Sequence, residues 1–277
     1  MTKIKTKERT SPLTAVIMVP LALVVALPLY YIVVNTFKTQ AEMSSSPFAL
    51  PTQLFLHNYA TVFGTVPLVQ SFANTLYVTV LSLVLMLIIG SMAAYGMIIG
   101  SSRFNRWFGA ALVLGFIIPS QSTLIPLYRL LVRIGLIDTL TGLVLLYSAG
   151  SIFCYFLIQG YMKSVPYDLV EAARIDGASA FAIYWRIVLP LIRPILVTVA
   201  VFQTMWIWND FITPNVFLVS PEKSTLVLQV YKSVGEFTTD WPSFMTLSVL
   251  ALVPMVVFFV FTQRHIVSGL LAGGVKG

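Results

Sequence analysis

Long apolar stretches alternate with short polar segments along this chain, and the polar segments carry nearly all of the charged residues. The hydrocarbon core of a bilayer is about 30 Å thick, so a helix that crosses it needs roughly 20 apolar residues. Six stretches have that length, and we expect each to span the membrane: 10–37, 71–100, 107–128, 139–162, 190–211 and 241–263. The pattern predicts an all-α integral membrane protein with six transmembrane helices and both termini on one side.

The composition favours the same environment. Of the 277 residues, 58% are hydrophobic and 10% are charged, whereas about a quarter of the residues in a soluble domain are charged. The polar surface that a soluble protein needs is therefore missing. The apolar run at 13–34 follows a basic N-terminus, but it is longer than the roughly 7–15 residues of a signal-peptide core, so we expect a retained first span.

The basic residues are unevenly divided between the two predicted sides. Lys and Arg are retained in the cytoplasm, and 12 of the 17 fall on the side of the termini and of segment 163–190. This side is therefore predicted to be cytoplasmic, and the net charge of +7 requires no nucleic acid as a partner. Arg129 and Arg133 fall on the outer side, where they either end a helix and reach lipid headgroups or contact an external partner.

Segment 163–190 contains six charged residues between two long apolar stretches. A helix that starts near Pro166 would end at Gly177, which can adopt the left-handed conformation that terminates helices. Ser179 is a suitable N-cap for a second helix. The segment is therefore predicted to be a helix, a glycine elbow and a second helix. It is either a solvated connection between two spans or a docking element for another protein.

The motif in this segment favours a docking element. Glu171-Ala172-Ala173, Gly177 and the group Ile187, Leu189, Pro190 resemble, with the spacing intact, the EAA loop in the membrane subunits of ATP-binding-cassette (ABC) importers. The sequence at 208–210, Trp-Asn-Asp, and the C-terminal 269–277 are similar to those of the carbohydrate-uptake branch. Within that branch the whole chain resembles the shorter, maltose-type permease subunit.

This resemblance implies a type I ABC importer permease in a cell (cytoplasmic or inner) membrane. The implied partners are a second homologous permease, two ATPase subunits that hold ATP and Mg, an extracytoplasmic solute-binding protein and the lipid bilayer. The chain itself is expected to bind no cofactor and to catalyse no reaction. We expect an N-terminal tail, first span and outer loop at 1–70, a permease core at 71–263 and a cytoplasmic tail at 264–277.

The resemblance also implies which residues couple the permease to the ATPases. Those expected in the coupling loop are Glu171, Ala172, Ala173, Arg174, Asp176, Gly177, Ile187, Leu189 and Pro190. Gly273, Gly274 and Lys276 in the tail are implied to contact the ATPases as a flexible peptide. The outer segment 214–241 is implied to reach the solute-binding protein. Neither this segment nor segment 38–70 is long enough for a binding domain of its own, which typically needs about 50 residues, so we expect a separate protein to capture the solute.

Polar residues inside two spans are candidates for the substrate path. Asp210 is the only acidic residue within a predicted span, and intramembrane carboxylates are costly and often functional. It adjoins aromatic and amide side chains that could bind a sugar, although aromatic residues also mark membrane boundaries. The candidates are Gln121, Gln203, Trp206, Trp208, Asn209 and Asp210. Gln121 lies among prolines that should break the third span.

Other classes of site are weakly represented. The two histidines are far apart, with no Cys or carboxylate at a metal-ligand spacing, so no metal site is expected, and no phosphate-binding loop is found. The alternative to an importer subunit is an ATP-independent secondary transporter or channel. Against it, the chain has no inverted pair of broken segments of the kind typical of such transporters.

Overall fold

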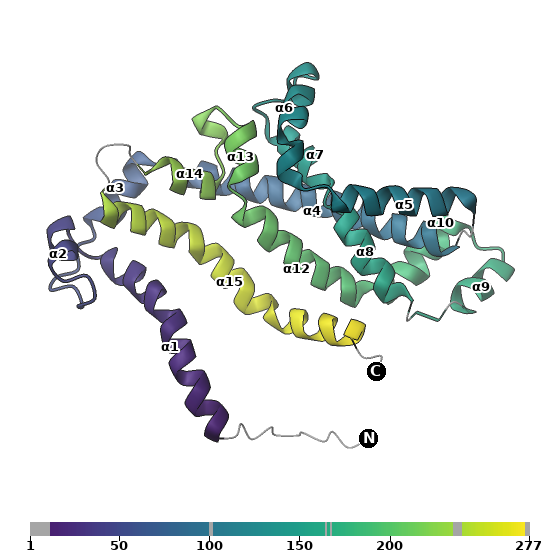
Figure 1. Ribbon diagram of the computed structural model, residues 1–277, viewed down its shortest axis with the longest axis horizontal. Helices are drawn as coiled ribbons and strands as arrows, with labels where there is room; N and C mark the ends of the chain where they lie inside the picture. The colour runs from purple at the N-terminus through teal and green to yellow at the C-terminus, as the bar shows by residue number, and fades with distance from the viewer. Residues whose placement is uncertain (1–11, 100–101, 164, 167, 235–239, 275–277) are drawn as a thin grey trace. The chain divides into compact units, whose positions relative to one another are not determined.

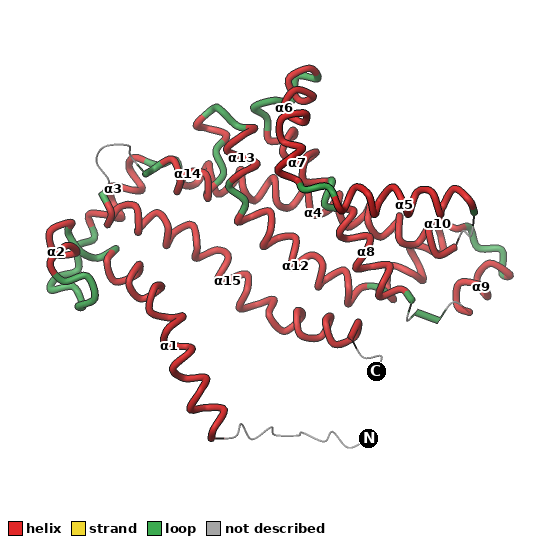
Figure 2. Tube along the Cα trace, in the orientation of Figure 1, coloured by secondary structure: helices red, strands yellow, loops and turns green. Residues whose placement is uncertain are grey.

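The computed structural model describes residues 12–99, 102–163, 165–166, 168–234 and 240–274. All regular elements in these residues are helical (Figure 2), which agrees with the prediction from the apolar pattern. By contacts between Cα atoms, the chain divides into two compact units, and the division falls inside the last helix. Unit 1 comprises 1–66 and 233–250, and unit 2 comprises 67–232 and 251–277.

Four helical stretches in the described residues are long and apolar enough to cross a bilayer, and the third of them contains a short turn between Ser148 and Ser151. They are Val16–Asn35, Leu68–Ile98, Leu140–Met162 and Trp241–Arg264. Two further spans are bent pairs, at Arg103–Ile117 with Ser120–Arg133 and at Ala180–Leu191 with Arg193–Asn209. The structure therefore has four spans, or up to six if each bent pair counts as one, and the third and fifth predicted spans are not continuous helices.

Prolines explain both breaks. Ile118 precedes Pro119 and is extended, with φ −69° and ψ 122°, because a residue before proline is disfavoured in the helical region. The two halves of the third span consequently meet at 94°. In the fifth span, Pro194 lies in the first turn of a new helix, where its missing N–H is tolerated, and the halves meet at 75°.

Unit 1 contains helices α1 (Pro12–Asn35), α2 (Gln40–Ser45) and α3 (His57–Thr65), together with the first turns of α15 (Trp241–Gly274) (Figure 1). None of the apolar window of α1 is buried against protein. A helix that is hydrophobic all round and uncovered by protein is suited to contact with lipid.

A buried lysine organises the segment between α1 and α3. The ammonium of Lys38 is fully buried, and Nζ donates to the backbone oxygens of Ser46 and Pro47 at 2.7 and 3.4 Å. Asn58 Nδ2 in turn donates to the backbone oxygens of Thr36 and Lys38. These bonds satisfy buried polar groups that would otherwise be costly, so the segment has a defined structure.

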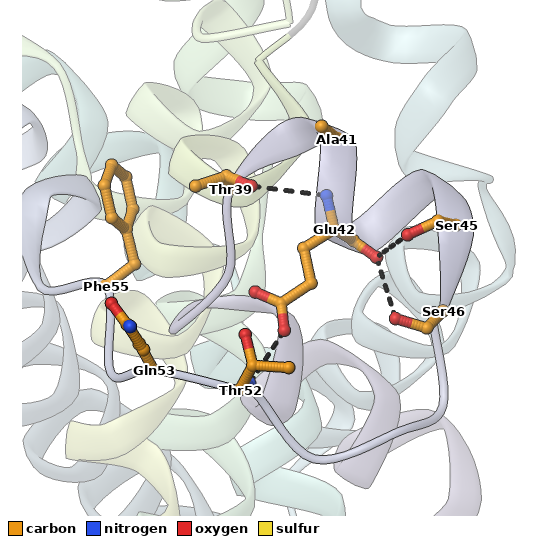
Figure 3. A pocket seen from close by; sticks show the side chains of 8 residues that line it. All are labelled: Thr39, Ala41, Glu42, Ser45, Ser46, Thr52, Gln53 and Phe55. Atoms are coloured by element: carbon orange, nitrogen blue, oxygen red, sulfur yellow. Dashed lines mark hydrogen bonds between the residues drawn. The ribbon is translucent and has the colours of Figure 1, made fainter.

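The same segment encloses an open cavity of about 610 Å³, shown in Figure 3. Hydroxyl groups, the Gln53 amide and the Phe55 ring line it. Thr52 N donates to Glu42 Oε1 at 2.7 Å, and this bond lowers the pKa of Glu42 below its usual value. The Glu42 carboxylate therefore stabilises the wall of the cavity.

Unit 2 contains the remaining elements. They are α4 (Leu68–Ile99), α5 (Arg103–Ile117), η1 (Ser120–Thr123), α6 (Leu124–Arg133), α7 (Leu140–Ser148), α8 (Ser151–Met162), α9 (Asp168–Ile175), α10 (Ala180–Ile183), η2 (Tyr184–Val188), α11 (Leu189–Leu191), α12 (Arg193–Asn209), α13 (Ile212–Phe217), η3 (Pro221–Lys223), α14 (Leu226–Lys232) and the rest of α15. Helix α4 is central, because α7, α8 and α12 all pack on it.

Close packing at the centre depends on a glycine. A Cβ atom added to Gly90 in α4 would lie 2.7 Å from the Cβ of Cys154 in α8, a distance too short for two carbon atoms. Small residues let membrane helices approach closely. Cys154 and Ile158 on α8 and Met86 on α4 are fully buried at this contact.

Candidate functional site

Segment 163–190 has the predicted form of helix, glycine elbow and helix. Helix α9 ends in a Schellman motif: Ala178 N donates to Ala173 O, and Gly177 N donates to Arg174 O, each at 3.0 Å. Gly177 has a φ of +78°, which residues with a Cβ rarely adopt. Ser179 caps α10, where its side chain accepts from Ala182 N. Local sequence therefore determines the shape of this elbow.

One side of α9 faces away from the core of unit 2. Glu171 and Ala172 are exposed, and Ile175 is 84% exposed. Val170 is buried on the opposite side. Among the described residues the Glu171 carboxylate makes no ion pair or hydrogen bond. An exposed surface with apolar, small and charged residues side by side is suited to contact with another protein.

The second half of the motif packs inward. Ile187 and Leu189 are half-buried against the core cluster, and Val188 between them is fully buried, whereas Pro190 is exposed. The predicted coupling residues therefore divide into an exposed group on α9 and an anchoring group on η2 and α11. Ala173 is half-buried, while Arg174 and Asp176 are exposed on the elbow.

Two tyrosines that the sequence analysis missed attach the elbow to α4. Tyr95 Oη donates to Ala180 O at 2.9 Å, at the start of α10. Ser91 Oγ and Tyr184 Oη are hydrogen-bonded at 2.7 Å, and Tyr184 is only 2% exposed. Ser91 and Tyr95 are four apart on α4, so they share a face. This pair of hydroxyl residues within an apolar span is the signal that could have revealed them.

The predicted substrate-path residues converge only in part. A cavity of about 840 Å³ is lined by α5, η1, α8 and α12, and its polar residues include Gln121 and Gln203. A neighbouring cavity of about 200 Å³ contains Tyr147 and Asp210. Both cavities share Gln121 and Trp206 in their walls. Four of the six candidates thus lie around one continuous region of unit 2.

Trp208 and Asn209 do not join them. Trp208 is 5% exposed and lies edge-on to Phe72 of α4, with ring centroids 5.7 Å apart. Asn209 is exposed, and its Nδ2 donates to Met205 O at 2.8 Å. Consecutive residues of an α-helix point about 100° apart, since there are 3.6 residues per turn. Residues adjacent in sequence therefore could not all face one cavity.

Tyr147 is the residue that the sequence analysis missed here. Its hydroxyl donates to Asp210 Oδ2 at 2.8 Å, and its ring lies edge-on to Trp206, with centroids 5.5 Å apart. The other carboxylate oxygen of Asp210 accepts from Thr213 N at 3.3 Å. Aromatic pairs prefer this edge-to-face arrangement. Nothing in the sequence around Tyr147 indicates that it lies beside residues 206–210.

A second polar cluster joins the connection between α6 and α7 to the connection between α13 and α14. Asp138 accepts from Val219 N, Ser220 N and Ser220 Oγ, and it forms the ion pair with Lys223 Nζ at 3.1 Å. Burial alone would raise the pKa of Asp138, but the hydrogen bonds from Ser220, Val219 and Lys223 outweigh it and hold the pKa far below its usual value. Asp138 therefore stays charged and links two connections of unit 2.

The remaining predicted residues lie outside these clusters. Gly273 and Gly274 are the last two residues of helix α15, and Lys276 lies outside the described residues, so contact of a flexible tail with the ATPases stays a prediction. Arg129 and Arg133 are exposed on α6, which is compatible with both of their readings. Among the described residues no group of three His, Cys, Asp or Glu could hold a metal ion.

Comparison with known proteins decides the family. Residues 86–271 match the model of the binding-protein-dependent transport system inner membrane component. This chain belongs to that family. The permease is therefore a multi-pass, non-catalytic subunit of an ABC transporter in the inner membrane, and the alternative of an ATP-independent transporter or channel is set aside.

Its relatives place the permease in the carbohydrate-uptake type. It is 37% identical, over 90% of its length and 91% of the relative, to the probable starch degradation products transport system permease protein AmyC of Thermoanaerobacterium thermosulfurigenes. It is 33% identical to the melibiose/raffinose/stachyose import permease protein MelC of Bacillus subtilis, over 91% of each chain. It is a permease subunit of a sugar ABC importer.

A solved structure confirms the fold. The permease resembles a chain of a bacterial ABC transporter involved in the import of the acidic polysaccharide alginate, with a TM-score of 0.82 at 24% identity. The match covers 91% of the permease and 94% of the other chain. The all-helical ABC importer permease fold is thus confirmed, whereas the orientation of the termini stays a prediction from the distribution of Lys and Arg.

Proposed function

We propose that segment 163–190 couples closure of two partner ATPases to outward opening of this permease. The observation that carries the proposal is the elbow at Gly177. Its helix α9 exposes Glu171, and its second helix is attached to α4 by two hydrogen bonds. Exposed Glu171, Ala172 and Ile175 would enter a cleft of an ATPase. A small residue such as Ala172 would let the partner approach the helix backbone.

The partner set follows from the family. A binding-protein-dependent system requires a solute-binding protein outside the membrane, and uphill uptake requires an energy source. In this proposal two ATPases hold ATP and Mg, and a second permease completes the translocation path. The outer segment 214–241 would contact the solute-binding protein, and the end of α15, with Gly273, Gly274 and Lys276, would contact the ATPases.

The route of force into the membrane would pass through α4. Tyr95 and Tyr184 join α10 and η2 to α4 by two buried hydrogen bonds, and π-helical turns such as η2 are frequent at functional sites. Since α7, α8 and α12 pack on α4, movement of the elbow would reach the helices that enclose the cavities. We propose that Gln121, Gln203, Trp206 and Asp210 form the share of the sugar path that this chain contributes.

A pair of glycine variants tests the coupling proposal. Gly177→Val forces a β-branched residue into a positive φ, and we expect the ratio of sugar imported to ATP hydrolysed to fall about tenfold, since such strain costs on the order of 1–3 kcal/mol. Gly135 has a φ of +71° and, like Gly177, has no atom within 4 Å of an added Cβ. Gly135→Val is therefore the matched control for strain away from the elbow.

The assay is sugar uptake and ATP hydrolysis by the complete transporter in proteoliposomes. The expected result is uncoupling in Gly177→Val and a near-normal ratio in Gly135→Val at equal assembly. A normal ratio in Gly177→Val would refute the role of the elbow. Equal losses in both variants would show that strain itself, and not the coupling segment, is responsible.

A further inference from the structure

We infer that the two adjoining cavities form one subsite for an uncharged sugar residue. Gln203 and Trp206 contact the sugar, and Tyr147 holds Trp206 and Asp210 in position. The inference rests on the proposed share of this chain in the sugar path, and it adds the chemical class of the substrate and a positioning residue.

Trp206 provides an aromatic surface in both cavities. Its side chain is 48% exposed, although the neighbouring Ile207 and Trp208 are buried in the core. Its ring packs against Tyr147 at an interplanar angle of 81°, and nearly half of the side chain remains exposed. An exposed indole combines an apolar face with a polar edge, and a sugar ring likewise has apolar C–H faces and polar hydroxyls at its rim.

Gln203 provides a hydrogen-bonding group whose partners within the protein are weak, namely the sulfur atoms of Met86 and Cys154 and the distant carbonyl of Gly150. The residue is 5% exposed and lines the larger cavity. Its Nε2 donates to the thioether of Met86 at 3.2 Å and to Gly150 O at 3.5 Å. A thioether is a weak acceptor, and the second bond is at the limit of hydrogen-bonding distance. A sugar hydroxyl would be a better partner for this amide.

The protein makes room for this arrangement. A Cβ atom on Gly150 would lie 2.8 Å from Gln203 Nε2, so a larger residue at 150 would displace the amide. Gln121, on the opposite wall at η1, lines both cavities together with Ser120 and Thr123. The cavities therefore combine aromatic, apolar and uncharged polar walls, as is typical of sites that bind small neutral molecules.

The charge of the walls determines which sugars fit. Among the described residues that line the two cavities there is one carboxylate, Asp210, and there is no Lys, Arg or His. The two hydrogen bonds to the Asp210 carboxylate come from uncharged donors, Tyr147 Oη and Thr213 N. A carboxylated sugar would meet a like charge in a partly dehydrated site, where repulsion is stronger than in water. A neutral sugar would not.

Tyr147 acts through its neighbours. It is 2% exposed, so it scarcely reaches the cavity itself. Its ring holds the indole of Trp206, while its hydroxyl holds the carboxylate of Asp210. One side chain thus sets the position of the Trp206 ring relative to the Asp210 carboxylate.

The test uses Ser120→Cys as a reporter in the assembly of the permease with its paired permease and ATPases. Ser120 lines both cavities, and the native Cys154 is fully buried. The rate of maleimide alkylation is measured with neutral probes, namely maltotriose, raffinose and arabinotriose, and with trigalacturonate as the charged probe. The solute-binding protein is omitted, so that its sugar selectivity does not contribute to the measured protection.

We expect at least one neutral probe to protect the reporter, and trigalacturonate to need a concentration about tenfold higher, equivalent to about 1.4 kcal/mol. Trp206→Ala should raise the concentration of neutral probe needed about tenfold. Asp210→Asn should bring trigalacturonate to within about threefold of the neutral probe. Asn215→Ala, an exposed residue of α13, serves as the control and should change neither.

Tyr147→Phe separates positioning from a structural role. It keeps the ring beside Trp206 and removes the bond to Asp210, so charge discrimination should fall while protection by the neutral probe changes less than about threefold. If Tyr147 had only a structural role, protection by the neutral probe and by the charged probe would fall equally. The inference is overturned if no neutral probe protects, if trigalacturonate protects equally well, or if Asp210→Asn changes nothing. Failure of the proposed function would instead appear as wild-type assembly without ATP-driven uptake.

Discussion

Asp138 and Glu171 are both acidic residues in connections between helices of unit 2, yet their environments differ completely. Asp138 accepts hydrogen bonds from Val219 and Ser220 and pairs with Lys223, so its charge is satisfied within the protein. Glu171 is exposed on α9 and has no such partner among the described residues. The first charge stabilises the fold, whereas the second remains available to another molecule.

This difference gives a criterion for separating structural from docking charges. A structural charge has a strongly shifted pKa and several donors around it, as Asp138 has. A docking charge lies beside small and apolar exposed residues, as Glu171 lies beside Ala172 on α9. Substitution of the first should affect stability, and substitution of the second should affect assembly and transport.

The largest effect is expected for Glu171→Lys. Reversing a charge that is dehydrated on docking typically costs 2–5 kcal/mol, so ATP-driven uptake should fall by about 30-fold or more. Copurification of the ATPase subunits measures docking, and thermal melting of the permease in detergent should stay unchanged. The control for copurification is Glu222→Lys, at an exposed acid of η3; uptake is not compared in this control, because η3 lies in the segment proposed to contact the solute-binding protein. Normal copurification with Glu171→Lys would contradict a docking role.

Asp138→Ala should have the opposite profile. It removes several hydrogen bonds and places alanine at a φ of +54°, and the loss of stability should be about 2 kcal/mol with little effect on transport per ATP. Asp138→Asn isolates the charge, since asparagine tolerates this conformation. The contrast with Glu171 fails if Asp138→Ala uncouples transport without lowering the melting temperature.

The same site predicts a dependence on pH. The pKa of Asp138 is depressed in the folded state, so its contribution is complete above the unfolded pKa of about 3.9 and is lost as pH falls towards the folded pKa. Melting of the wild type should therefore lose stability below about pH 4, and Asp138→Asn should lose less over that range.

Tyr184→Phe should produce the smallest change and should affect both properties. Loss of the bond to Ser91 should lower stability by about 1 kcal/mol and should reduce sugar imported per ATP by about twofold to threefold, because the elbow is then joined to α4 by one bond fewer. Tyr128→Phe, at an exposed tyrosine of α6 that packs against Phe217, is the control. An unchanged transport ratio would remove Tyr184 from the route of force.

Features encoded by neighbouring residues could be predicted from the sequence. The elbow at Gly177, the cap at Ser179 and the breaks at prolines follow from short-range rules for backbone conformation, and the spans follow from their length and apolarity. The break in the third span was expected from its prolines, whereas the fifth span was expected as a single helix. The angle at either break depends on packing, which the local sequence does not specify.

Features that join distant residues could not be predicted. Tyr147 and Asp210 are 63 positions apart, and Ser91 and Tyr184 are 93 apart, so no local pattern relates them. The cluster at 206–210 was interpreted as one site because its residues are adjacent, but the turn of the helix sends Trp208 to α4 and leaves Trp206 at the cavity. The directions of these side chains could not be assigned from the sequence.

The 75° angle between Ala180–Leu191 and Arg193–Asn209 has a mechanical consequence. Because the two arms are nearly perpendicular, a displacement along the first arm is delivered almost broadside to the second. Helix α12 would then tilt about its far end and would slide little along its own axis. Under the proposed coupling, a movement of Ala180–Leu191 along its own axis would therefore rotate α12 within the membrane.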